Sequence, residues 1–322
     1  MKIKHSNNIS IISFICFFFL GCSSTQLIEI SKDDQLNNLL TDIGYTELSV
    51  NASENTKKLI LKSLIKLDSK IKITFVEEIN NDTLVVTDNF LNQKFTYYCK
   101  SANSYLEEKT KQDIFATKQE NKIFVFYVDK FLPEIEIFKK NYPEVNVFKL
   151  EDDYDELIKE TFELSGSYSR SNLLDRLIQE EEVNFVPRPR KDIKKIYIVS
   201  EYDQAKNFIP SLRFNYILDR EIYASSRAII KIDDRKKLLD FSNLLLTVPN
   251  SFTEENNSSN LDELSKISFL QDLIIVSAFK KNNGKSQTIL GKFGNIRYSQ
   301  STCSDIDLNL VRIDAQGKFN LL

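Results

Sequence analysis

The chain has 322 residues, with 43 lysines and arginines against 46 aspartates and glutamates, and a formal net charge of −3. This acidic balance argues against nucleic acid as a partner, because nucleic-acid-binding domains are usually basic. With one histidine, four cysteines and no tryptophan, the chain also has few residues for a zinc site or for histidine-based catalysis.

The first 22 residues resemble an export signal that ends in a lipid attachment site. Lys2 and Lys4 precede an apolar run over residues 9–20, which is short for a bilayer span but suits the core of a signal peptide. Gly21 and Cys22 follow directly, as a lipoprotein signal peptidase requires. We therefore predict cleavage after residue 21 and a stable membrane anchor through lipid on Cys22. The alternative is an ordinary signal peptide or anchor helix in which Cys22 has no role.

Cleavage would change the inventory of reactive groups. Lys2, Lys4 and His5 would leave, so that the formal net charge would become −5 and no histidine would remain. We therefore predict no catalytic residue, no metal and no cofactor. Cys99 and Cys303 would remain besides Cys22, and an oxidising compartment would permit a disulfide between them, but the sequence leaves open whether they pair.

From residue 46 onwards the sequence alternates between strand and helix patterns, after a polar tether over residues 22–45. The apolar run at 122–128 predicts a buried parallel strand, and a helix is expected over 129–141, with Asp129 as its cap and Pro133 in its first turn. The other expected elements of this unit are strands at 145–150, 195–200 and 221–225, helices at 153–164, 169–179 and 202–209, and a closing segment at 240–248. This order predicts a right-handed parallel sheet that is covered on both faces.

The remaining sequence predicts a loop, a long helix and several short strands. Residues 250–260 are polar and without periodicity, and residues 261–281 form one long helical pattern. Residues 288–322 are typical of short strands, with turns at Gly291, Gly294 and Gly317. The cluster at 165–167 (SGS) predicts a turn before the helix that starts at Ser169.

Residues 185–200 (FVPRPRKDIKKIYIVS) resemble the F-x-P-R-R-R-x-D-I-D segment of the penicillin-binding-protein activator lipoproteins, the LppC family. The similarity continues at 222–227 (IYASSR), which resembles the V-Y-A-T/S-S motif of that family, and at 165–177, which resembles its S-x-x-R-x-x-x-L helix. Asp272 lies where the family has the acid of its Y-A-x-G-x-D-A-Y helix. The resemblance covers residues 120–250 and 262–322.

The resemblance implies an α/β fold of the type 1 periplasmic-binding-protein class, with two Rossmann-like lobes of which the first is reduced. Residues 46–119 with 261–305 are expected to form the first lobe, and residues 120–248 with 306–322 the second. It also implies an outer-membrane lipoprotein on the periplasmic face that binds and activates a bifunctional penicillin-binding protein, the peptidoglycan synthase. Such a protein is a regulator of peptidoglycan synthesis and not an enzyme. The chain departs from longer members of the family because it has no room for their helical-repeat domain.

Arg188, Arg190 and Asp192 precede a predicted strand and form the first group of candidate site residues. This cluster can bind an anionic surface of a partner, or it can hold a local network of ion pairs.

Tyr223, Ser225, Ser226 and Arg227 form the second group, at the end of another predicted strand. Ligands bind at the carboxyl ends of strands in open α/β folds, so these residues can line a cleft between the lobes. Alternatively, Tyr223 packs in the core and the serines cap the turn. Two other functions stay open: a lipoprotein that holds a small solute between its lobes, and an envelope hydrolase, for which no acid or nucleophile constellation is recognisable.

Overall fold

The computed structural model describes residues 45–67, 70–76, 83–85, 98, 100–116, 122–177, 185–217, 219–254, 260–282, 287–299 and 303–322. The predicted signal peptide, the Cys22 lipidation site and the tether up to residue 44 lie outside the described residues. In the part of the chain that is described, no helix combines the length and apolar character needed to cross a membrane.

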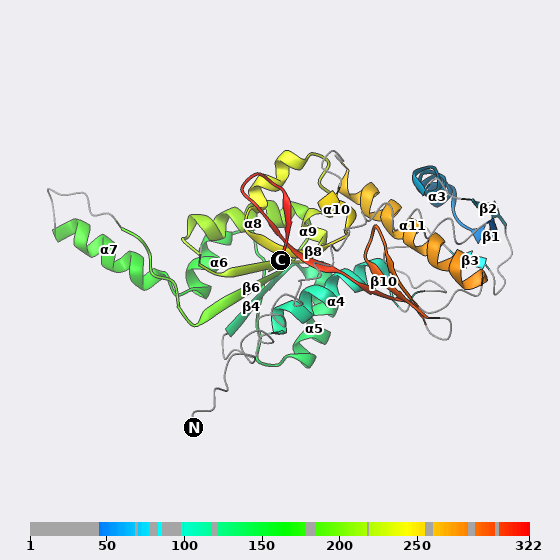
Figure 1. Cartoon of the computed structure of the whole chain (residues 1–322). Helices are drawn as coiled ribbons and strands as arrows, with labels where there is room; N and C mark the ends of the chain where they lie inside the picture. Colours follow the sequence, from blue (N-terminus) through cyan, green and yellow to red (C-terminus); the bar gives the residue numbers. More distant parts are fainter. Residues whose placement is uncertain are drawn as a thin grey trace, which may run out of the picture.

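A seven-stranded sheet forms the larger unit of the molecule (Figure 1). Its strands, in spatial order, are β13 (Phe319–Leu321), β12 (Asn309–Ile313), β8 (Leu244–Val248), β7 (Glu221–Ala224), β6 (Ile193–Val199), β4 (Lys122–Tyr127) and β5 (Asn146–Lys149). The five strands β8, β7, β6, β4 and β5 run parallel to one another, whereas β12 is antiparallel to both β8 and β13. The predicted α/β fold with a parallel sheet is confirmed, and the four predicted strands lie within two residues of their observed bounds.

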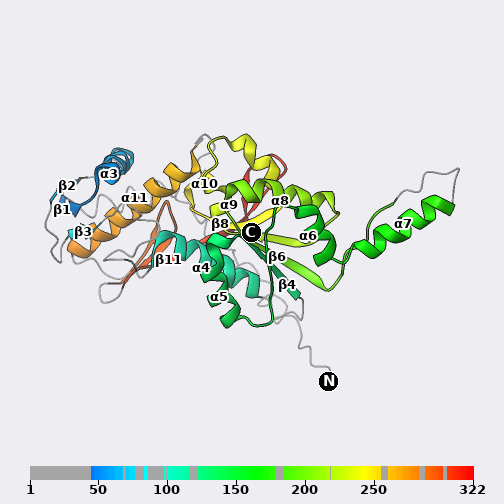
Figure 2. The same cartoon turned by 180° about the vertical axis from the view of Figure 1, so that it is seen from behind.

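Side chains of the parallel strands alternate between two hydrophobic cores, one on each face of the sheet. Phe124, Phe126 and Ile196 face the first core, while Val125 and Tyr197 face the second. The first core is covered by α6 (Tyr154–Thr161), α8 (Tyr202–Phe214), α9 (Arg227–Ile230) and the 3-10 helix η3 (Arg235–Phe241). The second is covered by the 3-10 turn η2 (Asp129–Phe131), α5 (Leu132–Asn141) and the end of α4 (Ala102–Phe115). Figure 2 shows α8 and α9 on one side of the sheet and α4 and α5 on the other.

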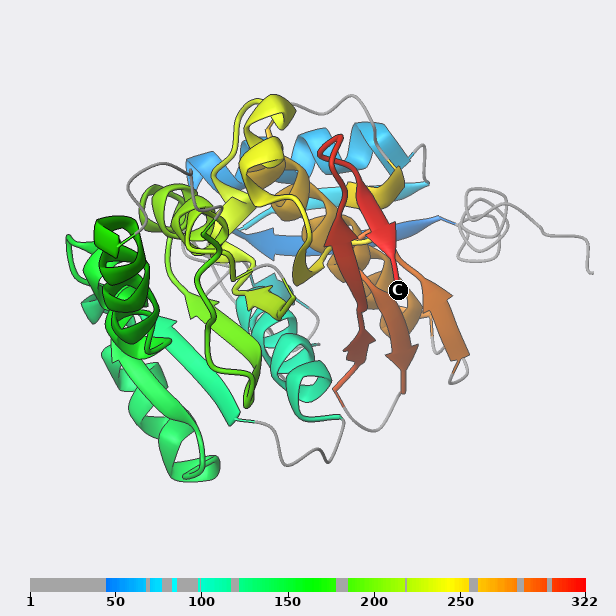
Figure 3. The ribbon, with the colours of Figure 1, turned by 90° about the vertical axis from the view of Figure 1, so that its left-hand side faces the viewer.

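A smaller unit combines segments from both ends of the chain, seen in blue and orange in Figure 3. It contains a parallel sheet of β2 (Ile71–Phe75), β1 (Thr46–Asn51) and β3 (Thr83–Val85), and an antiparallel sheet of β11 (Asp305–Asp307), β10 (Asn295–Tyr298) and β9 (Gln287–Leu290). Helix α3 (Glu54–Leu67) packs against α11 (Leu261–Lys281) in this unit.

Two helices contribute to the cores of both units. The first turn of α11 places Leu261 and Leu264 in a core of the large sheet, whereas its later turns lie in the core of the small unit. The side-chain oxygen of Asn260 accepts a hydrogen bond from the Glu263 N–H at 3.0 Å and so caps this helix at its predicted start. In the same way, α4 places Leu106 in the small core and Ile114 in the large one. These two helices therefore set the geometry of the space between the units.

A buried carboxylate holds one turn of the small unit against α11. Asp272 is fully buried and accepts hydrogen bonds from the backbone N–H groups of Lys292, Phe293 and Gly294 at 2.8, 2.9 and 3.2 Å. A side chain at Gly291 would lie 2.2 Å from this carboxylate, so the turn has no room for another residue type there. Burial raises the pKa of Asp272 to about 7, against the three N–H donors, which favour the charged form.

The predicted start of the helix over 169–179 is wrong. Helix α7 (Ser165–Leu177) begins four residues earlier, so that residues 165–167 are its first turn, and residues 178 and 179 lie outside the described part. Glu163, with φ of 56°, ends the preceding helix and lets the chain start again at once. The Ser169 hydroxyl donates to the Ser165 carbonyl at 2.9 Å and so lies inside the helix. Figures 1 and 2 show α7 standing away from the rest of the molecule.

The predicted end of the helix over 202–209 is also wrong. Helix α8 continues through Pro210 to Phe214, although proline removes one backbone hydrogen bond. Phe208, Ile209 and Leu212 are all buried in the core, and this burial outweighs the lost bond.

Two further local predictions need correction. Asp129 does not cap a helix, because it starts η2, and α5 begins at Leu132 with Pro133 in its first turn, as predicted. The predicted loop at 250–260 contains the short helix α10 (Ser251–Glu254), whose Phe252 is buried, and residues 255–259 lie outside the described part. The expected Gly turns between β9 and β10 and between β12 and β13 are present.

Candidate functional site

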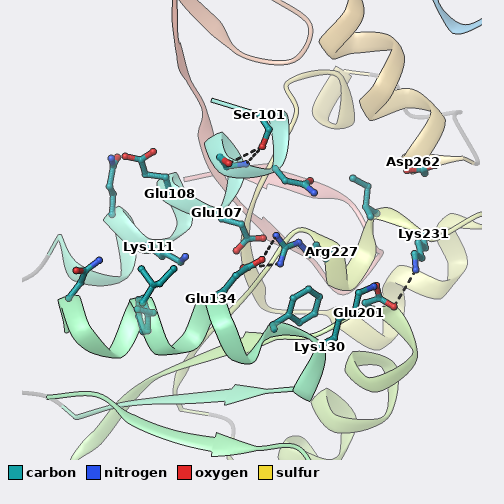
Figure 4. A pocket seen from close by; sticks show the side chains of 18 of the residues that line it. Ser101, Glu107, Glu108, Lys111, Lys130, Glu134, Glu201, Arg227, Lys231 and Asp262 are labelled. Atoms are coloured by element: carbon teal, nitrogen blue, oxygen red, sulfur yellow. Dashed lines mark hydrogen bonds and ion pairs between the residues drawn. The ribbon is translucent and has the colours of Figure 1, made fainter. Parts of the chain in front are cut away.

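A large cleft opens beyond the carboxyl ends of β4, β6 and β7, where parallel strands of open α/β sheets commonly bind ligands (Figure 4). Its volume is about 1120 Å³, which is enough for a ligand of drug size. One wall is α4 and the other is α5, while the start of α11 lies at one end. The charged residues that line it are Glu107, Glu108, Lys111, Lys130, Glu134, Glu201, Arg227, Lys231, Asp262 and Lys266.

Arg227 lines the cleft as the first residue of α9, three residues after the end of β7. Its Nη1 and Nη2 atoms contact the two carboxylate oxygens of Glu134, each at 3.0 Å, in a bidentate pair. The guanidinium carbon is 4.6 Å from the centre of the Phe131 ring, so that a cation–π contact adds to the pair. Burial lowers the pKa of Arg227, but the carboxylates of Glu107 and Glu134 raise it more, and the net shift is upwards. The cation is therefore permanent and held in place on two sides.

Glu107 connects α4 to the sheet from inside the protein. Only 5% of this residue is exposed, and its carboxylate accepts a hydrogen bond from the Tyr197 hydroxyl at 2.6 Å and another from Ser225. Burial, followed by the charge of Glu107, raises the pKa of Tyr197 well above its ordinary value, so this tyrosine stays a donor. A carboxylate with two donors and a nearby arginine is well satisfied in spite of its burial.

Lys111 lies one helical turn after Glu107 on α4 and lines the same cleft. Its Nζ atom is 5.6 Å from the centre of the Phe138 ring. Among the described residues it has no carboxylate partner, in contrast to the other cations of the cleft. Figure 4 shows Lys111, Glu107, Glu134 and Arg227 converging on one part of the cavity.

A second group of charges lies at the far end of the cleft. Glu201 pairs with both Lys130 and Lys231, the latter at 3.3 Å, and Lys266 pairs with Asp262 at 2.7 Å along α11. The lysines of the Glu201 cluster lower the pKa of that carboxyl. The side chains of these ion pairs are partly exposed. In each of them, lysines at the rim of the cleft neutralise a carboxylate.

The second group of predicted site residues divides between the cleft and the core. Arg227 lines the cleft, and Ser225 lies behind it as a donor to Glu107. Ser226 is buried next to them. Tyr223 packs in the core on the face of the sheet that α4 and α5 cover, and its hydroxyl donates to Glu221 at 3.1 Å. The structure therefore brings Ser225 and Arg227 together around Glu107, whereas Tyr223 points into the protein.

The first group lies elsewhere. Arg190 and Asp192 precede β6, whereas Arg227 follows β7. Because β6 and β7 are parallel, the two groups lie at opposite ends of the strands. Arg190 donates to Asp192 from Nε at 3.1 Å and from Nη2 at 2.7 Å, and to Glu163 from Nη1 at 2.8 Å. The Arg190 guanidinium, with Lys122, lowers the pKa of Asp192 below its ordinary range. Arg188 is exposed, and its backbone N–H donates to the Ser167 hydroxyl at 3.2 Å.

Sequence reasoning missed Glu107, Lys111 and Glu134. Glu134 lies inside the helix predicted over 129–141, in the first turn of the observed α5, whereas Glu107 and Lys111 lie on α4, which was not predicted from the sequence. No group of three or more potential metal ligands occurs among the described residues. Cys303 is a free, exposed thiol, and Cys99 lies outside the described part of the chain.

No protein-family model matches the chain, and no curated protein matches it either. Among solved structures the chain is similar to the "LpoA (YraM) C-domain from Haemophilus influenzae, a regulator of PBP1A", with a TM-score of 0.44 and 10% identity over 91% of this chain and 86% of that one. It is similar to an extracellular ligand binding receptor from Desulfohalobium retbaense, with a TM-score of 0.44 and 10% identity over 86% of this chain and 59% of that one. A periplasmic binding protein from Burkholderia mallei gives a TM-score of 0.41 and 8% identity over 86% and 94%. These likenesses concern the fold and are too distant to assign a function.

Proposed function

We propose that the chain is an outer-membrane lipoprotein, anchored through lipid on Cys22, that regulates peptidoglycan synthesis by binding and activating a bifunctional penicillin-binding protein. In this proposal it acts as a binding protein and not as an enzyme. The resemblance of residues 165–177, 185–200 and 222–227 to the LppC family supports it, because the motifs occur in the same order.

The observation that carries the proposal is the exposed apolar face of the α7 arm, by which we mean Ser165–Leu177 with the returning segment 185–190. Leu173, Leu174 and Leu177 are 58%, 45% and 79% exposed, and Val186 on the returning segment is 54% exposed. Apolar side chains gathered on a projecting helix mark a surface that binds another protein, since their burial against a partner is favourable.

Arginines surround the apolar face of the arm and indicate the charge of its partner. Arg170, Arg176 and Arg188 are all exposed. Such a face fits a hydrophobic groove with acidic residues at its rim. Arg190 has a different part, because its pairs with Asp192 and Glu163 fasten the base of the arm to the sheet.

Binding to the synthase tests this proposal. The full chain, purified in detergent, is titrated against the bifunctional penicillin-binding proteins of the same organism, and the rate of peptidoglycan cross-linking is then measured. We expect saturable binding and faster cross-linking. The double variant Leu173→Lys/Leu177→Lys should bind at least about tenfold more weakly, as loss of two anchor side chains implies. Leu239→Lys is the matched control, since Leu239 is an exposed leucine on η3, away from the arm. Absence of binding to any of these synthases would reject the proposal.

A second candidate function is the binding of a small solute between the two units. The cleft favours it, because its size and its place at the carboxyl ends of β4, β6 and β7 are those of a ligand site. The two functions use different surfaces and do not exclude each other.

A further inference from the structure

We propose that the cleft binds a small organic carboxylate, whose carboxylate group contacts Lys111 on one side and Arg227 on the other. The inference rests on the second candidate function, solute binding, and does not depend on the α7 arm. Among the described residues, the charged side chains of the cleft form hydrogen bonds or ion pairs within the protein, with the one exception of Lys111.

The acidic residues of the cleft all have donors within the protein. Glu107 accepts from Tyr197 and Ser225, Glu134 pairs with Arg227, and the other pairs are Glu108 with Lys100, Glu201 with Lys130 and Lys231, and Asp262 with Lys266. Lys111 has only the face of Phe138 among the contacts that the described residues provide. Among the charged residues of the cleft that the structure describes, Lys111 is therefore the one without a hydrogen-bonding or ion-pairing partner, and a concave wall strengthens its attraction for an anion.

Arg227 can exchange its partner without moving. Phe131 covers one face of the guanidinium, and the charge of Glu107 lies close to it from the protein side. Only 17% of the Arg227 side chain is exposed, whereas 41% of the Glu134 side chain is. Glu134 can thus rotate into solvent, and a carboxylate from a ligand can take over the same bidentate geometry on a fixed guanidinium.

Lys111 and Arg227 line the same cleft. Lys111 is one turn from Glu107 on α4, and Glu107 is the carboxylate that borders Arg227 from that helix. Figure 4 shows the Lys111 amine directed towards the Glu134–Arg227 pair from across the cavity. A carboxylate that displaces Glu134 therefore meets both cations.

The rest of the wall indicates what the carboxylate is attached to. Side-chain amides and hydroxyls line the cleft beside the charged residues, namely those of Ser101, Asn103, Ser104, Gln112 and Asn141. These groups donate and accept hydrogen bonds, and so they suit the amides of a short peptide or the hydroxyls of a sugar acid equally well. The shared chemistry is a carboxylate on a polar, hydrogen-bonding body.

Calorimetric titration of the full chain with paired probes tests the inference. One pair is trialanine and trialanine amide, and the other is glucuronate and glucose, so that each pair differs in one carboxylate. We expect at least one carboxylate to bind about tenfold or more tightly than its uncharged counterpart, a difference of about 1.4 kcal/mol. The pair that shows the difference identifies the source of the carboxylate, peptide or sugar acid.

Two variants with opposite expected effects separate this site from a structural role. Lys111→Gln should weaken binding of the carboxylate about tenfold, while Glu134→Gln should strengthen it, because the amide competes less well for Arg227. Lys109→Gln is the control on the same helix, since Lys109 pairs with Asp113 and does not line the cleft. Equal binding of carboxylate and uncharged probes would overturn the inference and leave solute binding intact. Binding of none of the four probes, or a weakening by Glu134→Gln equal to that by Lys111→Gln, would overturn the carboxylate site.

Discussion

The cleft and the α7 arm present opposite kinds of surface. In the cleft the charges are mostly paired with one another, as in the bidentate contact of Arg227 with Glu134. On the arm, Leu173, Leu174 and Leu177 are 45–79% exposed. In our proposals, a carboxylate ligand of the cleft exchanges with an existing ion pair, which would make that site selective for charge. A partner of the arm would have only to bury apolar surface, which would make that site selective for shape.

The largest expected effect on stability comes from removing the carboxylate of Glu107, which is buried behind the cleft. Glu107→Leu leaves the hydroxyls of Tyr197 and Ser225 without an acceptor and takes a counter-charge from Arg227. Breaking a buried charged network by removing one partner costs about 3–5 kcal/mol. We expect the free energy of unfolding, measured by urea denaturation, to fall by an amount in this range.

The control for this variant is the next residue on the same helix. Glu108→Leu removes an ion pair with Lys100 in which both side chains are about two-fifths exposed, and such pairs contribute about 0–1 kcal/mol. Equal destabilisation by the two variants would show that Glu107 has no special part in joining α4 to the sheet.

Glu107 also shows why the sequence predicts one side of the cleft and not the other. Arg227 was found because it follows a buried strand, and parallel strands place such residues at one edge. Glu107 lies in the run Glu107-Glu108-Lys109, which has the look of a solvated face. Its burial depends on Tyr197 and Ser225, which are 90 and 118 residues away in the chain.

The sequence did not predict helix α4 as a whole, for a related reason. Leu106 packs in the core of the small unit, while Ile114 packs in the core of the large sheet. A helix that enters two cores at its two ends does not repeat its apolar residues along one face, and periodicity is the main signal that a sequence provides. By contrast, α11 was predicted with its observed bounds, because the residues from Phe269 to Phe279 are all buried and eight of these eleven are apolar.

A smaller effect is expected from the buried carboxylate of the other unit, Asp272, when the pH changes. With a pKa of about 7 in the folded protein, against 3.8 as its ordinary value, Asp272 binds a proton at pH 6 only when the chain is folded. The free energy of unfolding should therefore fall by about 1 kcal/mol between pH 6 and pH 8, and level off above that range.

This pH dependence can be measured cleanly because the only histidine of the chain is His5. Asp272→Asn should abolish it and also lower stability at pH 6, since an amide cannot accept from all three N–H groups of the turn. Asp262→Asn, in an i,i+4 pair with Lys266 on the same helix, should leave the dependence unchanged. The same slope in all three proteins would show that Asp272 does not titrate in this range.

The smallest expected effect is that of Leu174→Ser on the arm, and Leu164→Ala, ten residues earlier in the chain, is the reference with a large effect. Leu164 is fully buried at the base of the arm, whereas Leu174 is 45% exposed on α7. Leu164→Ala should lower the free energy of unfolding by about 2–5 kcal/mol, and Leu174→Ser should change it by no more than about 0.5 kcal/mol. If Leu174→Ser instead destabilises the chain as much as Leu164→Ala, then the leucine face of α7 is packed within the protein and is not free to bind a partner. A small effect of Leu174→Ser on stability combined with a large loss of synthase binding would assign this face to a partner, because Leu174 would then contribute to binding and not to folding.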